Sequence, residues 1–124
     1  MPKILLVEDN EVNRDMLERR LQRSGYQVVC AVDGPGGVRD ALHYLPDLIL
    51  MDIALGAMDG WEATQLIKAD YRTASIPIIA LTAHALETDR RRSVEIGCAD
   101  FDTKPVDYQR LMGKIERHLA IKAA

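Results

Sequence analysis

The chain has 124 residues, of which 48% are hydrophobic and 28% are charged, and its formal net charge is −3. This composition predicts one globular domain over residues 1–124, and the mildly acidic balance argues against a domain drawn to DNA or RNA by its charge. No apolar run is long enough for a bilayer span or a signal-peptide core, so a cytoplasmic location with no membrane partner is expected.

Short apolar runs alternate with amphipathic segments along the whole chain. The first helix is expected to bury four apolar residues, Val12, Met16, Leu17 and Leu21. Glycines that follow the helical patterns, such as Gly25 and Gly97, supply stop signals. In chain order the predicted strands are Lys3–Val7, Gln27–Ala31, Leu48–Met51, Ile76–Leu81 and Phe101–Thr103, and the predicted helices are Asn10–Ser24, Gly36–Tyr44, Trp61–Ala69, Leu86–Ile96 and Asp107–Ile121.

Five strand-then-helix units in succession predict an α/β fold, a doubly wound parallel sheet with helices on both faces. The strands lack polar alternation, which is typical of a sheet that is buried on both sides. Right-handed crossovers reduce the possible topologies to a few, but the pattern alone leaves the strand order open.

Ionisable or hydroxyl side chains follow four of the five predicted strands. In open α/β sheets, ligands bind in the crevice beyond the carboxyl ends of the strands, so these side chains are expected to share one rim. Glu8 and Asp9 follow the first strand, Asp52 the third, Thr82 the fourth and Lys104 the fifth.

Three carboxylates on one rim repel one another. Two unit charges about 4 Å apart cost on the order of 4 kcal/mol at an effective dielectric constant of about 20. A divalent cation removes that penalty, and Mg²⁺ typically binds through one or two carboxylates together with phosphate oxygens and water. A phosphoryl group on Asp52 would add negative charge, which only the metal and Lys104 would make tolerable. Carboxylates do serve as phosphoryl acceptors, so Asp52 is a chemically reasonable nucleophile.

The order and spacing of five motifs resemble the receiver domains of two-component response regulators, over nearly the whole chain. The motifs are Ile4-Leu5-Leu6-Val7-Glu8-Asp9-Asn10, Asp47-Leu48-Ile49-Leu50-Met51-Asp52-Ile53, Met58-Asp59-Gly60, Ile79-Ala80-Leu81-Thr82-Ala83 and Asp102-Thr103-Lys104-Pro105. The resemblance implies a flavodoxin-like (βα)5 fold with strand order 2-1-3-4-5, of the stand-alone, single-domain type.

The resemblance also implies a role for each motif residue. Asp52 would be the phospho-acceptor, and Thr82 and Lys104 would bind the phosphoryl group. Phe101 stands at the position of the family's switch aromatic, and the bond before Pro105 is expected to be cis. The implied ligands of Mg²⁺, or of Mn²⁺ in its place, are Asp9, Asp52 and the backbone carbonyl of Ala54, with Glu8 acting through water.

The implied partners are proteins. A histidine kinase or histidine phosphotransfer protein would donate the phosphoryl group, meeting Asn13, Arg14 and the loop Pro105-Val106-Asp107. The face made by the fourth helix, fifth strand and fifth helix would then change shape for a downstream protein partner, as in a phosphorelay. The chain is expected to be a monomer or a weak homodimer.

Two other functions remain open from the residues. An Asp-nucleophile phosphatase on a similar α/β fold would need an acid–base carboxylate two residues after Asp52, where this chain has Ala54. A flavin or nucleotide binder would need a glycine-rich loop after the first strand, where this chain has Glu8 and Asp9.

Several positions also have a simpler reading or depart from the family pattern. Phe101 can be plain core, Arg90-Arg91-Arg92 a solvated helix face, and His84 an exposed loop residue. His43 and His118 are given no role. Leu55 and Gly56 replace the family's usual methionine and proline, which predicts a looser loop after Asp52.

Overall fold

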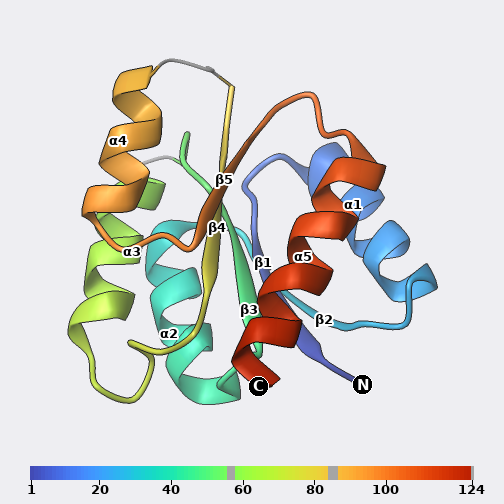
Figure 1. The fold of residues 1–124 in the computed structure, drawn as a ribbon, viewed down its shortest axis with the longest axis horizontal. Coiled ribbons are helices and arrows are strands. Elements are labelled where there is room, and N and C mark those ends of the chain that lie inside the picture. The colour runs from blue at the N-terminus through green and yellow to red at the C-terminus, as the bar shows by residue number, and fades with distance from the viewer. Residues whose placement is uncertain (56–57, 84–86, 124) are drawn as a thin grey trace.

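The computed structural model describes residues 1–55, 58–83 and 87–123, and it contains five strands and five helices in strict alternation (Figure 1). His84 and Gly56, two positions considered from the sequence, lie outside these ranges. The elements are β1 (Lys3–Val7), α1 (Glu11–Arg23), β2 (Gln27–Ala31), α2 (Gly34–Tyr44), β3 (Leu48–Asp52), α3 (Gly60–Ala69), β4 (Ile78–Thr82), α4 (Glu87–Glu95), β5 (Asp100–Thr103) and α5 (Tyr108–Ala123).

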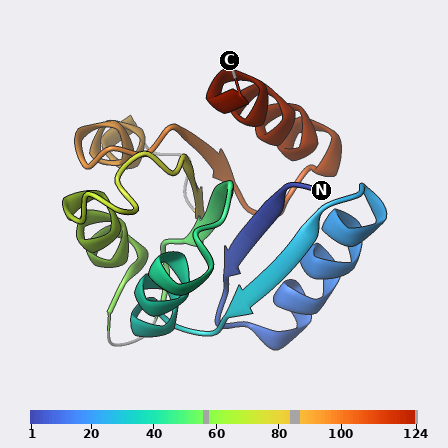
Figure 2. The same ribbon diagram turned by 90° about the horizontal axis from the view of Figure 1, so that it is seen from below.

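All five strands are parallel and lie in the order β2-β1-β3-β4-β5, which confirms the predicted flavodoxin-like topology. Helices α1 and α5 cover one face of the sheet, and α2, α3 and α4 cover the other (Figure 2). Side chains of successive strand residues alternate between the two faces. The sheet therefore separates two hydrophobic cores.

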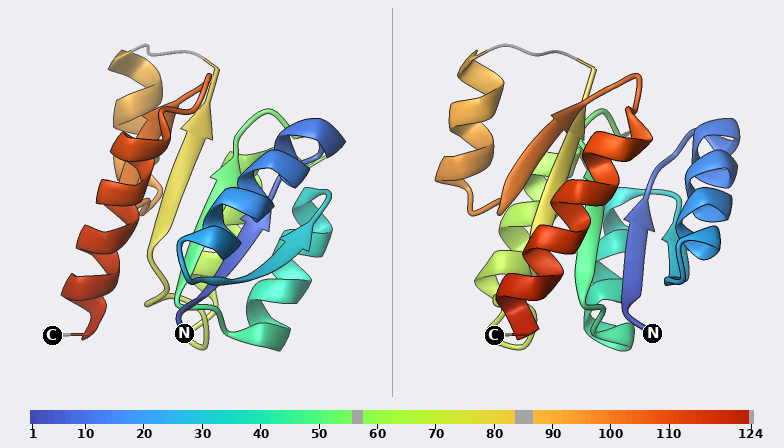
Figure 3. Two further views of the ribbon diagram at one scale, coloured as in Figure 1. Left: turned by 90° about the vertical axis from the view of Figure 1, so that its right-hand side faces the viewer. Right: turned by 45° about the vertical axis from the view of Figure 1, so that its right-hand side comes forward.

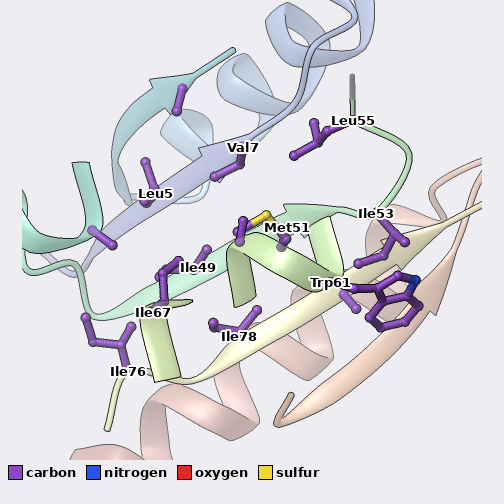
Figure 4. Packing of buried hydrophobic residues seen from close by; sticks show 14 of the residues in the cluster. Leu5, Val7, Ile49, Met51, Ile53, Leu55, Trp61, Ile67, Ile76 and Ile78 are labelled. Carbon is purple, nitrogen blue, oxygen red and sulfur yellow. The ribbon is translucent and has the colours of Figure 1, made fainter. Parts of the chain in front are cut away.

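The larger core lies under α2, α3 and α4. Figure 4 shows Leu5 and Val7 of β1 and Ile49 and Met51 of β3 in this core, with Trp61 near Ile53 at one end of it. Leu55 also belongs to this core, and its burial anchors the segment that follows Asp52. The second core contains Ile4, Leu6, Leu48, Leu50, Ile79 and Leu81 from the strands, with Leu17, Leu21, Leu111 and Ile115 from α1 and α5.

Helix starts follow the capping chemistry of the sequence. Asn10, Asp33 and Asp59 are the N-caps of α1, α2 and α3, and each side chain accepts a hydrogen bond from the backbone N–H three residues later. Because Asp33 caps α2, this helix begins at Gly34, two residues before the predicted start. Strands β3 and β4 each end one residue later than predicted, and so they include Asp52 and Thr82 themselves. Strand β4 also begins two residues later than predicted, at Ile78 instead of Ile76.

Of the four residues predicted to be buried on the inner face of α1, the prediction was wrong for two. Leu17 and Leu21 are buried, but the side chains of Val12 and Met16 are 67% and 52% exposed. Helix α1 packs at the β2–β1 end of the sheet and buries only a narrow stripe of its surface. No helix in the described part of the chain is long and apolar enough to cross a membrane.

Candidate functional site

The rim at the carboxyl ends of the strands brings the predicted acidic residues together. Glu8 follows β1, and Asp52 is the last residue of β3, which neighbours β1 in the sheet. Glu8 and Asp52 are only 1% and 2% exposed, whereas Asp9 is exposed. Carboxylate oxygens of Glu8, Asp9 and Asp52 lie within 4.8 Å of one another.

Lys104 connects the two buried carboxylates. Its Nζ lies 2.9 Å from Oε1 of Glu8 and 3.1 Å from Oδ1 of Asp52. Its backbone N–H donates to the carbonyl oxygen of Thr82 at 2.7 Å, which fixes the start of the loop after β5 beside β4. The Lys104–Pro105 peptide bond is cis. The ammonium group therefore supplies the positive charge that the buried acids need.

The backbone holds each acid in place. Oδ1 of Asp52 accepts a hydrogen bond from the N–H of Ala54 at 3.1 Å, and Oε2 of Glu8 accepts one from the N–H of Asn10 at 3.2 Å. Gly60 packs directly on the backbone of Asp52, because an added Cβ at Gly60 would collide with the Asp52 carbonyl oxygen. The end of β3 is therefore fixed both by its own turn and by the start of α3.

Burial shifts the pKa values of the ionisable side chains at this rim. Desolvation, together with the nearby Asp52 carboxylate, raises the pKa of the Glu8 carboxyl to about 7, despite the opposing effect of Lys104. Burial also works against the charged form of Lys104, but its hydrogen bond to Glu8 and the charge of Asp52 outweigh burial and raise the pKa of the ammonium group.

The three carboxylates suit a hard divalent cation. Mg²⁺ prefers oxygen ligands and usually keeps several waters, so one exposed acid beside two buried ones provides both ligands and solvent access. This donor set, which lacks thiolate and imidazole groups, is unlike that of a structural zinc site.

Two other predicted residues occupy the neighbouring strands. Thr82 is the last residue of β4 and is 4% exposed, next to the strand that ends in Asp52. Phe101 lies in β5 and is 9% exposed, so its ring contacts the larger core rather than the acidic group. The guanidinium carbon of Arg90 lies 5.9 Å from the centroid of this ring. All three arginines of the segment Arg90-Arg91-Arg92 are exposed, as expected.

Sequence reasoning missed two contacts, one beside the site and one at the start of β5, away from the rim. Arg14 of α1 donates a hydrogen bond from Nη1 to the carbonyl oxygen of Glu8 at 3.0 Å and so braces the turn after β1. His118, which was given no role, lies with Nε2 2.9 Å from Oδ2 of Asp100. The signal for this second contact was a pair of acids, Asp100 and Asp102, in β5, followed by basic residues at helical spacing in α5.

Asp102 is the unusual member of that pair, because it is buried in β5. Its Oδ1 accepts a hydrogen bond from Nε of Arg110 at 2.8 Å, while Nζ of Lys114 lies 4.0 Å from its Oδ2. These ion pairs tie α5 to the edge strand of the sheet.

Comparison with known proteins gives a consistent result. Residues 4–116 match the family model of the response regulator receiver domain. The polar-differentiation response regulator DivK of Brucella anthropi is 37% identical over 120 residues, covering 96% of this chain and 98% of DivK. The DNA-binding dual master transcriptional regulator RpaA of Synechocystis sp. is 36% identical over 115 residues, and this chain, of which 93% is matched, spans only about half (48%) of its length.

A solved structure extends the similarity to a metal-bound site. The receiver domain of the sensor histidine kinase PA1611 from Pseudomonas aeruginosa, which has a magnesium ion coordinated in its active-site cleft, is 40% identical with a TM-score of 0.89. The match covers 96% of this chain and 98% of that domain. The sequence match, the strand order and the clustered acids lead to one conclusion: the chain belongs to the response regulator receiver domain family.

Proposed function

We propose that Asp52 accepts a phosphoryl group and that the chain is a phosphorylation-controlled signalling switch. One observation carries the assignment of the acceptor: Asp52 ends the central strand, is nearly buried, and has Nζ of Lys104 3.1 Å from its Oδ1. A buried carboxylate with a cation in reach can both attack phosphorus and have its phosphorylated form stabilised.

The phosphodonor is a histidine kinase or a histidine phosphotransfer protein. A carboxylate oxygen of Asp52 attacks the phosphorus of the phosphohistidine, the new P–O bond replaces the P–N bond, and the imidazole nitrogen keeps the electron pair and takes up a proton. The Ala54 N–H and the Lys104 ammonium orient the attacking carboxylate. Thr82 and Lys104 then contact phosphoryl oxygens, Thr82 as a hydrogen-bond donor and Lys104 as a charge.

Mg²⁺ is the cofactor of this proposal. Asp9, Asp52 and the carbonyl oxygen of Ala54 would hold it, with Glu8 acting through water, and Mn²⁺ has similar ligand preferences. When bound, the ion neutralises the negative charge of the carboxylates and phosphoryl oxygens. The magnesium-bound PA1611 receiver domain supports the same ion here.

The donor approaches beside α1 and the loop after β5. A cavity of about 170 Å³ lies next to Lys104 and is also lined by Asn13, Met16, Pro105 and Val106. This cavity supports a docking role for Asn13, Pro105 and Val106. The proposed docking surface also includes Arg14 and Asp107, their neighbours in the chain. If exchanging these residues left the preference among kinases unchanged, this docking role would be abandoned.

The output is a contact with a downstream protein through α4, β5 and α5. Thr82 and Phe101 lie on adjacent paired strands, so a movement of Thr82 towards a phosphorylated Asp52 changes the packing around Phe101. The near-complete coverage of DivK by this chain supports a single receiver domain over residues 1–124.

The experiment is phosphorylation by acetyl phosphate with Mg²⁺, followed by intact-mass analysis. The wild-type chain gains one phosphoryl group and Asp52→Ala gains none, while chelation of the metal with EDTA abolishes the gain. Labelling that persists in Asp52→Ala contradicts the assignment of the acceptor. Sustained hydrolysis of p-nitrophenyl phosphate would instead favour the phosphatase alternative, for which Ala54 leaves no acid–base carboxylate.

A further inference from the structure

The buried carboxyl group of Asp102 has no part in the proposed phosphoryl transfer. Asp102 lies in β5 and is 4% exposed. Its Oδ1 accepts hydrogen bonds from the backbone N–H of Thr103 and from Nε of Arg110, both at 2.8 Å. Its Oδ2 is buried too, but no donor in the described part of the chain forms a hydrogen bond with it. A buried acceptor without a donor is unfavourable, so this oxygen requires an explanation.

Lys114 of α5 is close to this oxygen, but its ammonium group is bound to a different acceptor. Its Nζ lies 4.0 Å from Oδ2 of Asp102 and donates a hydrogen bond to the carbonyl oxygen of Phe101 at 2.5 Å. A carboxylate is a stronger acceptor for an ammonium group than a neutral peptide carbonyl. Lys114 therefore occupies the weaker of two neighbouring acceptors while the stronger one is left without a donor.

The third acidic neighbour of Lys114, Asp100, does not hold it in this place. Nζ of Lys114 lies 3.5 Å from Oδ1 of Asp100, beyond the length of a strong charge-assisted hydrogen bond. Oδ1 of Asp100 already accepts from the N–H of Phe101 at 2.8 Å, and its Oδ2 contacts Arg117 and His118. Asp100 would keep these partners if the ammonium group moved away.

The surroundings of Lys114 leave room for such a movement. Helix α5 lies alongside β5 (Figure 3), and Lys114 lines two cavities at this edge of the sheet. One has a volume of about 200 Å³ and includes Asp100, and the other has a volume of about 250 Å³ and includes Asp102. A displacement of Nζ by about 1 Å would bring it within charge-assisted hydrogen-bond distance of Oδ2 of Asp102.

The backbone connects this group to the phosphorylation site. The N–H of Lys104 donates to the carbonyl oxygen of Thr82 at 2.7 Å, and Thr82 lies on the strand next to the one that ends in Asp52. A movement of Thr82 towards a phosphorylated Asp52 therefore pulls on the end of β5. The Phe101 carbonyl group belongs to the same short strand, so its position relative to α5 changes as well.

Resting on the proposed function, we propose that Lys114 is a two-position latch between β5 and α5. In the unphosphorylated chain its ammonium group holds the Phe101 carbonyl oxygen, as in this structure. In the phosphorylated chain it moves to Oδ2 of Asp102 and completes the hydrogen bonding of that carboxylate. Lys114 is thus a positioning residue: it does not touch the phosphoryl group, but it favours the phosphorylated state and shifts α5 with it.

The test measures binding of beryllofluoride with Mg²⁺, which mimics a phosphoryl group on an aspartate. Its Kd is determined by isothermal titration calorimetry for the wild type, Lys114→Met, Asp102→Asn and the double variant. Each single variant should bind about fivefold more weakly, because it lacks an ion pair that forms only in the phosphorylated state. The double variant should bind no more weakly than the single ones. Arg117→Met is the matched control, since Arg117 is another α5 cation paired with Asp100, and it should bind as the wild type.

A second readout observes the latch itself. The carboxyl-carbon NMR signal of Asp102 should shift when beryllofluoride is added to the wild type, and this shift should be absent in Lys114→Met. If Asp102→Asn fails to fold, Lys114→Met and this signal decide.

Two results would overturn the proposal. The first is a Lys114→Met variant that melts at a lower temperature but binds beryllofluoride as tightly as the wild type, because Lys114 would then only stabilise the fold. The second is a double variant whose loss of affinity equals the product of the two single losses, because the two residues would then act independently. Failure of the proposed function looks different, since even the wild type would then bind no beryllofluoride and would stay unmodified by acetyl phosphate.

Discussion

The Nζ atom of Lys104 lies 2.9 Å from Oε1 of Glu8, although 96 positions separate the two residues in the chain. The same nitrogen lies 3.1 Å from Asp52. One ammonium group thus serves two nearly buried carboxyl groups. A change in any of the three alters the charge balance of the other two, and this dependence gives the first two predictions.

Replacing Lys104 with methionine should destabilise the chain. The substitution keeps most of the apolar stem but leaves the buried Glu8 and Asp52 without their cation. We expect the free energy of unfolding at pH 8 to fall by about 1 to 3 kcal/mol, less than for a fully buried pair because Lys104 is partly exposed. Urea denaturation measures this change, and added Mg²⁺ should restore part of it. Arg91→Met, at an exposed cation of α4, is the control, and an equal loss in that variant would argue against the electrostatic explanation.

Stability without metal should decrease as pH rises through neutrality. The folded chain raises the pKa of Glu8 from 4.5 to about 7, so between these values the folded state binds a proton that the unfolded state has released. The free energy of unfolding should therefore be highest below about pH 4.5 with respect to this group and should fall by roughly 1 to 3 kcal/mol by pH 8.

Denaturation at several pH values in the presence of EDTA provides the measurement for this prediction. Glu8→Gln should remove the decrease and should be the more stable protein at pH 8. A decrease that is the same in Glu8→Gln and in the wild type would assign it to other groups. Because the metal requires ionised carboxylates, Mg²⁺ affinity of the wild type should rise over the same pH range.

Gly60→Ala should destabilise the end of β3, the strand that carries Asp52. A Cβ at Gly60 meets the carbonyl oxygen of Asp52 and the Cα of Ile53, and neither backbone group can rotate away. We expect a loss of about 3 kcal/mol in stability, at the upper end of the range for overpacked sites. Phosphorylation by acetyl phosphate should also slow, because Asp52 moves with its backbone. A variant as stable as the wild type would show that the turn before α3 adapts freely.

Gly113→Ala should have the opposite effect on stability. Its Cβ enters open space in a helix, so the gain from reduced unfolded-state entropy is not offset by a clash. We expect the free energy of unfolding to rise by about 0.5 to 1 kcal/mol. Chemical denaturation of Gly60→Ala and Gly113→Ala side by side gives the comparison. A loss of stability in Gly113→Ala would contradict the open space found around this position of α5.

The strands and their parallel arrangement could be predicted because the relevant physics is local or general. Runs such as Ile4–Val7 and Leu48–Met51 are apolar without alternation, which is typical of a sheet covered on both faces. The rim residues could also be predicted, because parallel strands place their carboxyl ends at one edge of the sheet. The motif resemblance supplied the strand order that the pattern left open.

The errors concern contacts that depend on three-dimensional packing. The apolar period of α1 indicated an inner face that included Val12 and Met16, but the period does not reveal how much of a helix the sheet can cover. Which carboxyl group is buried and which is exposed, Glu8 or Asp9, depends on Lys104 far along the chain. The contact between His118 and Asp100 likewise depends on how α5 lies against β5.

The division of the interior into two cores has an evolutionary consequence. Residues under α1 and α5 pack in one core, and residues under α2, α3 and α4 pack in the other. Under the docking proposed above, duplicated genes for such a chain can acquire new kinases through changes in α1 and the loop before α5 while the packing beneath the opposite layer stays intact. Insulation between paralogous pathways can then arise in small steps, without each step having to preserve a single shared interior.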